Sequence, residues 1–204
     1  MHDRTDPHPP ATHWGGGVSP VGTGWRKLMM WWFIITDGLL FAGFLAAYGF
    51  LRLAAGSWPE RAQMFHLEFI ALMTFTLITS SATMATAVGA AQLGNRKLAL
   101  RFLLLTLLGG TAFLLMQAYE WSTLITAGAT LTQNPWGPPA FGACFFLITG
   151  FHGTHVLTGL IILAITAVRT ARGITQAEGI EMAGLYWHFV DLVWVFIFTL
   201  FYLV

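Results

Sequence analysis

The sequence predicts an all-α membrane protein, a bundle of five transmembrane helices. Hydrophobic residues make up 56% of the 204 residues and charged residues 9%, whereas soluble domains carry about 25% charged residues. The chain also contains five long apolar runs, each reaching the roughly 20 residues that a helix needs to cross the hydrocarbon core. Backbone groups in lipid must be satisfied within their own segment, and the runs are apolar on all sides. They therefore predict helices rather than strands of a barrel.

The predicted helices follow a polar N-terminal segment. Residues 1–27 hold four prolines and a triple-glycine run, which is typical of a flexible polar tail. Residues 28–204 form the predicted five-helix transmembrane domain. The first apolar run begins near Leu28 and exceeds the roughly 7–15 residues of a signal-peptide core, so no cleavable signal is predicted. The spans are predicted at 28–53, 66–91, 98–121, 140–168 and 181–204.

Basic residues are distributed unevenly between the predicted loops. If the N-terminus is inside, the outer side carries only Arg52 and Arg61. The positive-inside rule then predicts a cytoplasmic N-terminus and a periplasmic C-terminus in the inner (plasma) membrane of a bacterial cell. The residues assigned to the inner side are Arg4, Arg26, Lys27, Arg96, Lys97, Arg101, Arg169 and Arg172.

Composition argues against several other classes of protein. Net charge is +1, and no window shows the basic stripe of a nucleic-acid binder, so no nucleic-acid partner is expected. The single cysteine, Cys144, lies in an apolar run and is interpreted as a small buried hydrophobe. The tail histidines His2, His8 and His13 are interpreted as solvated, with weak metal binding as the alternative.

Ionisable residues inside the spans are the candidate functional groups, because a charge at mid-bilayer costs about 2.5–3.5 kcal/mol even on the lenient insertion scale. Asp37 and Asp191 lie about 14–15 Å from the inner ends of their spans at a rise of 1.5 Å per residue. His188 precedes Asp191 by three residues and shares its helical face. Asp37, His188 and Asp191 are therefore predicted to form a buried polar cluster. It either relays protons or holds the helices together, and spacing leaves both interpretations open.

Three further polar residues are expected to form hydrogen bonds between helices. His152 and His155 lie on one helix, and His188 lies about 9–13 Å away in depth at 1.5 Å per residue, which argues against a shared haem or metal site. No metal site is predicted in this chain. Glu120 is placed at the outer boundary of its span, where a carboxylate costs little.

Five segments resemble, in order, the motifs of subunit III of the haem–copper respiratory oxidases. Residue 73 is methionine where that family has asparagine, and residue 37 is aspartate where it usually has glutamate. The match is collinear from about Leu28 to Val204. The segments are 36–44 (TDGLLFAGF), 72–81 (LMTFTLITSS), 117–121 (QAYEW), 149–156 (TGFHGTHV) and 186–194 (YWHFVDLVW).

The resemblance implies an accessory subunit without a redox centre of its own, in a complex that acts as a proton-translocating cytochrome c or quinol oxidase. Haem and copper would lie in the partner catalytic subunit I, with subunit II in the same complex. Family members stabilise the catalytic subunit, support its proton uptake and hold phospholipids. Asp37 matches the family's carbodiimide-reactive carboxylate, and Arg169 matches an arginine that binds a lipid phosphate. Many members have two further N-terminal spans, so what closes the lipid cleft here stays open.

Other functions remain open at this point. Nitric oxide reductases carry accessory proteins similar to subunit III. An independent proton carrier would use Asp37, His188 and Asp191, although the sequence shows neither inverted repeats nor broken helices. A membrane cytochrome would need paired histidines on facing helices.

Overall fold

The computed structural model describes residues 24–60 and 64–203. It contains five helices that are long and apolar enough to cross a membrane. The predicted number of spans is confirmed for this part of the chain. The tail histidines and Arg61 lie outside the described residues. The helices are α1 (Trp25–Ala54), α3 (Leu67–Gln92), α4 (Arg96–Thr126), α5 (Pro139–Ala171) and α6 (Ala177–Phe198), and one turn of π-helix, η1 (Thr199–Leu203), continues α6.

Local sequence signals account for several helix ends. Asn95 caps α4, its side chain accepting a hydrogen bond from the amide of Leu98. Pro139 opens α5, where its missing N–H costs nothing. Gly94 and Gly173 follow α3 and α5 with φ of 74° and 76°, a conformation that only glycine adopts readily. The largest difference from the prediction is α4, which continues past Trp121 to Thr126.

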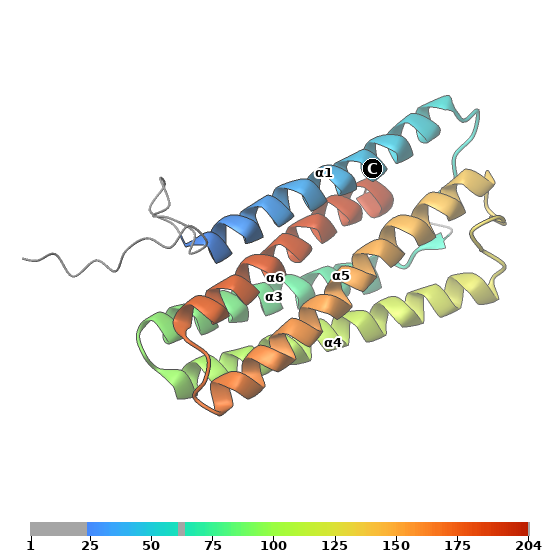
Figure 1. Cartoon of the computed structure of the whole chain (residues 1–204). Coiled ribbons are helices and arrows are strands. Elements are labelled where there is room, and N and C mark those ends of the chain that lie inside the picture. The colour runs from blue at the N-terminus through green and yellow to red at the C-terminus, as the bar shows by residue number, and fades with distance from the viewer. Residues whose placement is uncertain (1–23, 61–63, 204) are drawn as a thin grey trace, which may run out of the picture.

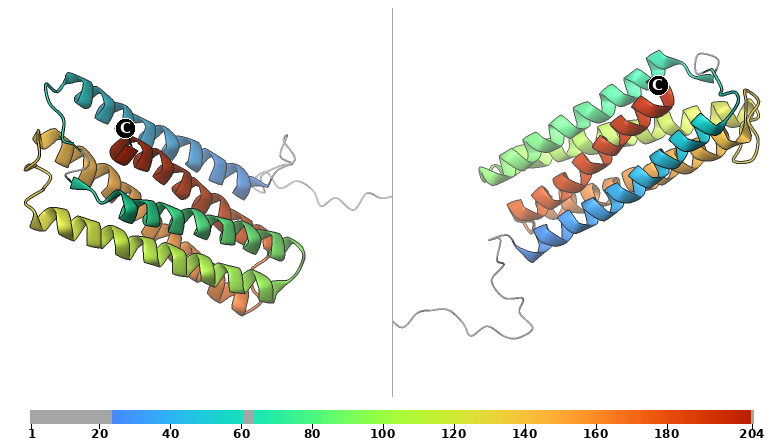
Figure 2. Two further views of the ribbon diagram at one scale, coloured as in Figure 1. Left: turned by 180° about the vertical axis from the view of Figure 1, so that it is seen from behind. Right: turned by 90° about the horizontal axis from the view of Figure 1, so that it is seen from above.

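Four of the helices form a ring. Helix α3 packs on α4, α4 on α5, α5 on α6 and α6 on α3. Helix α1 lies outside this ring, against α5 and α6 (Figure 1). Figure 2 shows the same arrangement from behind and from above, with α1 beside α6 in both views. The first helix therefore touches the ring along one side.

The centre of the ring is built around one indole. Trp187 of α6 is fully buried and reaches two glycines on neighbouring helices. A Cβ atom on Gly110 of α4 would lie 2.7 Å from its Cζ2, and one on Gly159 of α5 would lie 2.9 Å from its Cε3. Small residues let membrane helices approach closely, and dispersion then replaces the missing hydrophobic driving force.

Hydroxyl groups on α3 hold α6 in register. Trp187 Nε1 donates to Ser80 Oγ at 3.1 Å, and Trp194 Nε1 donates to Thr74 Oγ1 at 3.0 Å. Both hydroxyls donate onward to carbonyls of their own helix, Ser80 to Leu77 and Thr74 to Ile70. Each buried indole N–H therefore finds a partner where water is excluded.

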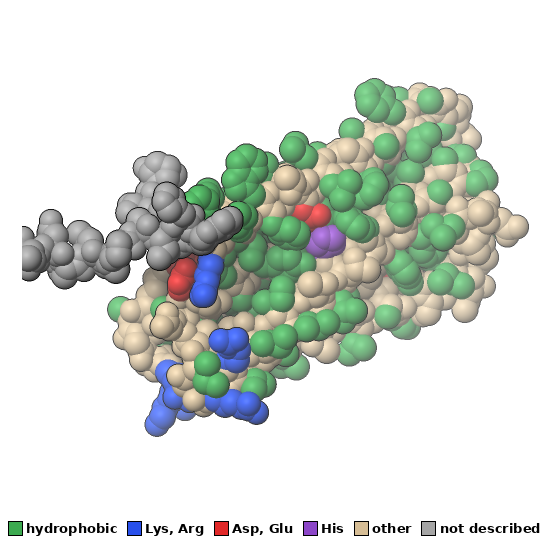
Figure 3. All heavy atoms as spheres, viewed as in Figure 1, with side chains coloured by type: hydrophobic (Ala, Val, Ile, Leu, Met, Phe, Trp, Pro, Cys, Tyr) green, Lys and Arg blue, Asp and Glu red, His purple; other side chains and the backbone are tan. Residues whose placement is uncertain are grey.

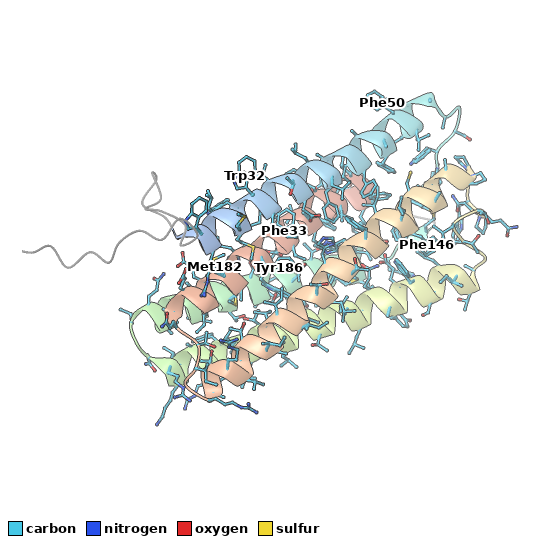
Figure 4. The ribbon with its side chains drawn as sticks, viewed as in Figure 1. Trp32, Phe33, Phe50, Phe146, Met182 and Tyr186 are labelled. Carbon is cyan, nitrogen blue, oxygen red and sulfur yellow. The ribbon has the colours of Figure 1, made fainter. Side chains whose placement is uncertain are left out.

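The outer side of α1 is exposed and strongly apolar. Trp32 is 59% exposed and Phe50 is 73% exposed, and both project away from the ring (Figure 4). Among the described residues of α1, Phe41 and Tyr48 are the buried ones. This surface suits lipid or another membrane helix.

Basic side chains gather at one end of the molecule, where α1 and α4 begin and α5 ends (Figure 3). Arg96 has a structural role there, because its guanidinium donates to the carbonyls of Thr170 and Ala171 at the end of α5. Lys27 near the start of α1 and Glu181 in the second turn of α6 pair at 2.6 Å. Both side chains are partly exposed, so the pair is worth at most about 1 kcal/mol.

Candidate functional site

An acid–histidine pair joins α1 to α5 near the middle of both helices. Asp37 Oδ2 lies 3.2 Å from His155 Nε2, and the two side chains are 10% and 14% exposed. Oδ2 accepts no hydrogen bond of standard geometry from the described residues, so the contact is an ion pair by distance. Figure 3 shows one acidic and one histidine side chain in contact at mid-length on a face that is otherwise largely apolar.

The hydrogen bond of His155 Nδ1 indicates which ring nitrogen carries a hydrogen. Nδ1 lies 2.9 Å from the carbonyl oxygen of Phe151. A carbonyl only accepts, so Nδ1 carries a hydrogen and donates it. A neutral ring would then turn the lone pair of Nε2 toward the carboxylate. A proton shared between Nε2 and Oδ2 would make this 3.2 Å contact favourable and would leave the pair neutral as a whole.

Aromatic rings surround this pair. Phe41, one turn beyond Asp37, meets the His155 ring edge-on with centroids 5.4 Å apart. On the other side, Tyr186 of α6 donates its hydroxyl hydrogen to the His155 carbonyl at 3.1 Å. Phe33 stacks on Tyr186 at 5.9 Å, and Figure 4 shows these two rings side by side between α1 and α6. The pair thus lies where α1, α5 and α6 meet, and the aromatic rings around it form a low-dielectric environment.

His188 and Asp191 do not join Asp37, and the expected single cluster is divided in two. His188 Nδ1 lies 2.6 Å from Ser81 Oγ of α3, and Asp191 interacts with the same serine and with His188. Residues two apart on a helix point about 200° apart. Tyr186 therefore turns toward α1 while His188 turns toward α3. Ser81 had been noted only as the end of the 72–81 segment, and its contact with His188 was not predicted, because a serine on an apolar helix carries no signal of its partner.

His152 differs from its expected role. It is 1% exposed, and neither ring nitrogen has a hydrogen-bond partner among the described residues. Its ring stacks on Trp194 at 5.3 Å and meets Phe113 edge-on at 6.0 Å. The interhelical hydrogen bond expected of His152 is absent from this part of the chain, whereas His155 contacts α1 through its side chain.

Glu120 is buried, not at a boundary. It is 6% exposed because α4 continues for more than a turn beyond it. Its Oε2 accepts from Gln117 Nε2 at 2.8 Å and from the Tyr202 hydroxyl at 3.0 Å. The second bond connects α4 to η1, so Glu120 does hydrogen-bond between elements as expected. The partner Tyr202, two residues before Val204, had not been predicted.

Arg169 lies in a cleft at the basic end of the molecule. The cleft measures about 620 Å³ and is lined by Arg26 of α1, by Ile165 and Arg169 of α5, and by Glu178 and Met182 of α6. Two guanidinium groups and the Glu178 carboxylate therefore line an opening whose walls are partly polar and partly apolar. In the sequence, Arg26 was used only to predict the orientation of the helices in the membrane. No local sequence signal places the start of α1 beside the end of α5.

No group of three or more histidine, cysteine, aspartate or glutamate side chains that could hold a metal occurs in residues 24–60 and 64–203. Cys144 is partly buried and free. The described geometry is that of a helical membrane protein with polar groups buried between its helices.

Comparison with known proteins assigns the family. The family described as Cytochrome c oxidase subunit III matches residues 8–204. The chain is 35% identical over 181 residues to cytochrome c oxidase subunit 3 of Alkalihalophilus pseudofirmus, covering 87% of this chain and 86% of that protein. It is 38% identical over 170 residues to a probable cytochrome c oxidase subunit 3 of Mycobacterium leprae, covering 81% of each. It is 35% identical over 181 residues to cytochrome bo(3) ubiquinol oxidase subunit 3 of Pseudomonas putida, covering 86% and 84%.

The chain belongs to the cytochrome c oxidase subunit III family. It is accordingly an accessory subunit of a haem–copper oxidase, and the resemblance of the five sequence segments to that family is confirmed. Its relatives include subunits of both cytochrome c oxidases and a quinol oxidase, so the complex it joins has oxidoreductase activity.

Proposed function

We propose that this subunit supports proton uptake by its oxidase through the Asp37–His155 pair. The observation that carries the proposal is the 3.2 Å contact between Asp37 Oδ2 and His155 Nε2 near the middle of the membrane-spanning helices, where a proton shared by the two atoms would stabilise the pair. A neutral pair can hold a proton at this depth without the cost of an isolated charge. Proton gain or loss changes the charge of the pair by one unit.

The replacement of the family's glutamate by Asp37 is compatible with this role. Aspartate is shorter by one methylene, and the His155 ring from α5 closes the remaining distance to 3.2 Å. The histidine thereby positions the carboxyl and sets how it shares its proton.

The test uses the assembled oxidase. Asp37→Asn and His155→Gln each remove the titratable pair while keeping a polar side chain, and we expect both to slow proton uptake modestly in single-turnover measurements. Asp191→Asn is the matched control, because Asp191 is a second mid-span carboxylate that interacts with Ser81 and His188 instead. Unchanged uptake in both pair variants would refute the proposal. A complete block would show that the pair belongs to the obligatory path.

We also propose that the subunit protects the catalytic subunit during turnover. Removal of the subunit should leave initial turnover of the haem-loaded remainder largely intact and shorten its active lifetime. Immediate and complete loss of activity in a correctly assembled remainder would contradict this role.

A phospholipid headgroup is the proposed ligand of the cleft at the basic end. Arg26 and Arg169 line it beside Ile165 and Met182, so phosphate and acyl chain would both find suitable neighbours. Guanidinium groups bind phosphate through charge-assisted, bidentate hydrogen bonds.

The proposed setting is the plasma membrane of a bacterium, with the N-terminus cytoplasmic and the C-terminus periplasmic. The concentration of lysine and arginine at one end of the described helices supports this orientation. The proposed direct partner is subunit I, which would hold haem and copper, with subunit II in the same complex. Cytochrome c or quinol would donate electrons to those subunits rather than to this chain.

A further inference from the structure

Two oxygen atoms at one end of the ring share an unusual environment. Glu120 Oε1 and Gln117 Oε1 are both buried, and neither accepts a hydrogen bond from the described residues. They belong to side chains already joined at 2.8 Å, through Gln117 Nε2 and Glu120 Oε2. Buried acceptors without a donor are costly. Two on one linked pair of side chains indicate that a shared donor is required.

The surroundings of Glu120 disfavour a charged carboxylate. Within the described residues, the groups that interact with it are the neutral side chains of Gln117 and Tyr202. Apolar rings pack on Tyr202 beside it, Phe65 with centroids 4.6 Å apart and Phe145 of α5 with centroids 6.1 Å apart. An ionised carboxylate would therefore lie in an apolar region without a countercharge, which is expensive in the membrane interior.

We propose that Glu120 is a proton-binding site, separate from the Asp37–His155 pair, in which the proton resides on Oε1. The hydroxyl of the protonated acid supplies the donor that Gln117 Oε1 lacks, and the amide of Gln117 continues to donate to Oε2. Acid and amide then form a two-bond ring. Tyr202 donates to Oε2 from η1 and aligns the carboxyl. The ligand of the site is a proton, held and released by one carboxyl oxygen.

A cleft connects this region to the surface at the end opposite the basic residues. It measures about 220 Å³, and Phe65, His66, Tyr119, Glu120 and Thr123 are among its lining residues. Glu120 lies six residues before the end of α4, about 9 Å along the axis. The titratable groups around the carboxyl are His66 at the start of α3, Tyr119 on its own helix and Tyr202 on η1. His66 is exposed and provides the route for proton exchange.

This site is distinct from the pair of the proposed function. Asp37 and His155 connect α1 to α5, whereas Glu120 connects α4 to η1 and lines a cleft on α3. A failure of either proposal therefore leaves the other standing, because their variants involve different residues and different bands in a vibrational spectrum.

Infrared difference spectroscopy of the assembled oxidase tests the proposal. In the wild-type-minus-Glu120→Gln spectrum at neutral pH, we expect loss of the carbonyl stretching band of a protonated carboxylic acid. That band should shift to lower frequency when the wild type is equilibrated with D2O. Asp37→Asn is the control and should leave this band in place. Loss of carboxylate stretching bands instead of the acid band would overturn the proposal.

If the Glu120→Gln subunit fails to assemble into the oxidase, a second variant tests whether Glu120 holds a proton. Tyr202→Phe removes one hydrogen bond to Oε2 and keeps the ring that packs on Phe145. We expect the acid band to move to higher frequency because the carbonyl oxygen then accepts one bond fewer. An acid band region unchanged by Tyr202→Phe would show that Glu120 holds no proton.

His66→Leu should slow the D2O shift of the same band, and an unchanged rate would refute the cleft as the exchange route.

Discussion

A Cβ atom at Gly110 would lie 2.7 Å from Cζ2 of Trp187, so a glycine on α4 is what admits the indole of α6 to the centre of the bundle. The same indole meets Gly159 of α5 and bonds to Ser80 of α3. One side chain therefore contacts all three of the other helices in the ring.

Gly110→Ala should destabilise the subunit. The added methyl group must displace the Trp187 ring, and overpacking of this kind costs about 1–3 kcal/mol. Thermal unfolding of the purified complex, followed by dissociation of this subunit, measures the effect. Gly43→Ala is the matched control, because its Cβ would meet nothing within 4 Å and alanine favours a helix. Equal stability of the two variants would show that Trp187 does not depend on Gly110.

Trp194→Phe should cost a smaller amount. The aromatic packing is largely kept, whereas the hydrogen bond to Thr74 at 3.0 Å is lost. Interhelical hydrogen bonds in membrane proteins contribute about 0.6 kcal/mol on average, so a double-mutant cycle with Thr74→Val should give a coupling of that size. Trp32→Phe, on the exposed side of α1, should be neutral by comparison. A coupling of zero between Trp194 and Thr74 would contradict the assignment of this bond.

The Asp37–His155 pair should show strong non-additivity. Asp37→Ala alone leaves His155 without its countercharge at mid-membrane, and breaking a buried pair in this way costs about 3–5 kcal/mol. Asp37→Ala combined with His155→Leu removes both groups and should recover much of that loss. The retention of this subunit in the complex during detergent titration measures both effects. Simple additivity of the two single changes would argue against a shared proton.

Arg26 and Arg169 should act together in lipid retention. Replacing either by glutamine should weaken phospholipid binding, and replacing both should remove it, because the headgroup phosphate loses its charged hydrogen bonds. Native mass spectrometry of the complex after gentle detergent extraction counts the lipids that stay bound. Arg172→Gln is the control, since Arg172 lies at the same end of α5 but does not line the cleft. Equal lipid loss in the control would indicate nonspecific attraction to the membrane surface.

The sequence alone predicted the number of spanning helices in the described part of this protein. Apolar runs of spanning length predict the five helices, because lipid leaves the backbone no other way to satisfy its hydrogen bonds. Ordered motifs such as 186–194 and 149–156 identified the family. Glycine and asparagine at the helix ends act through local geometry, which is why most boundaries were predicted to within a few residues.

Pairing between helices was accessible only in the tertiary structure. Depth along a helix can be read from the sequence at about 1.5 Å per residue, and it placed Asp37 and Asp191 at one level. It does not say which helices are neighbours or which way each residue faces. The side chain of Asp37 turns toward His155, while His188 turns toward Ser81.

Glu120 shows the same limit. Its position near the end of an apolar run suggested an exposed carboxylate, because the run as read from composition stopped at Trp121. The helix continues to Thr126, and Tyr202 returns from the far end of the chain to donate to it. Composition predicted a membrane protein with five spanning helices, and the ordered motifs indicated the subunit III family. The packing of α1, α4 and η1 against their neighbours decided which side chains the buried acids contact, since a contact between distant residues depends on the whole fold.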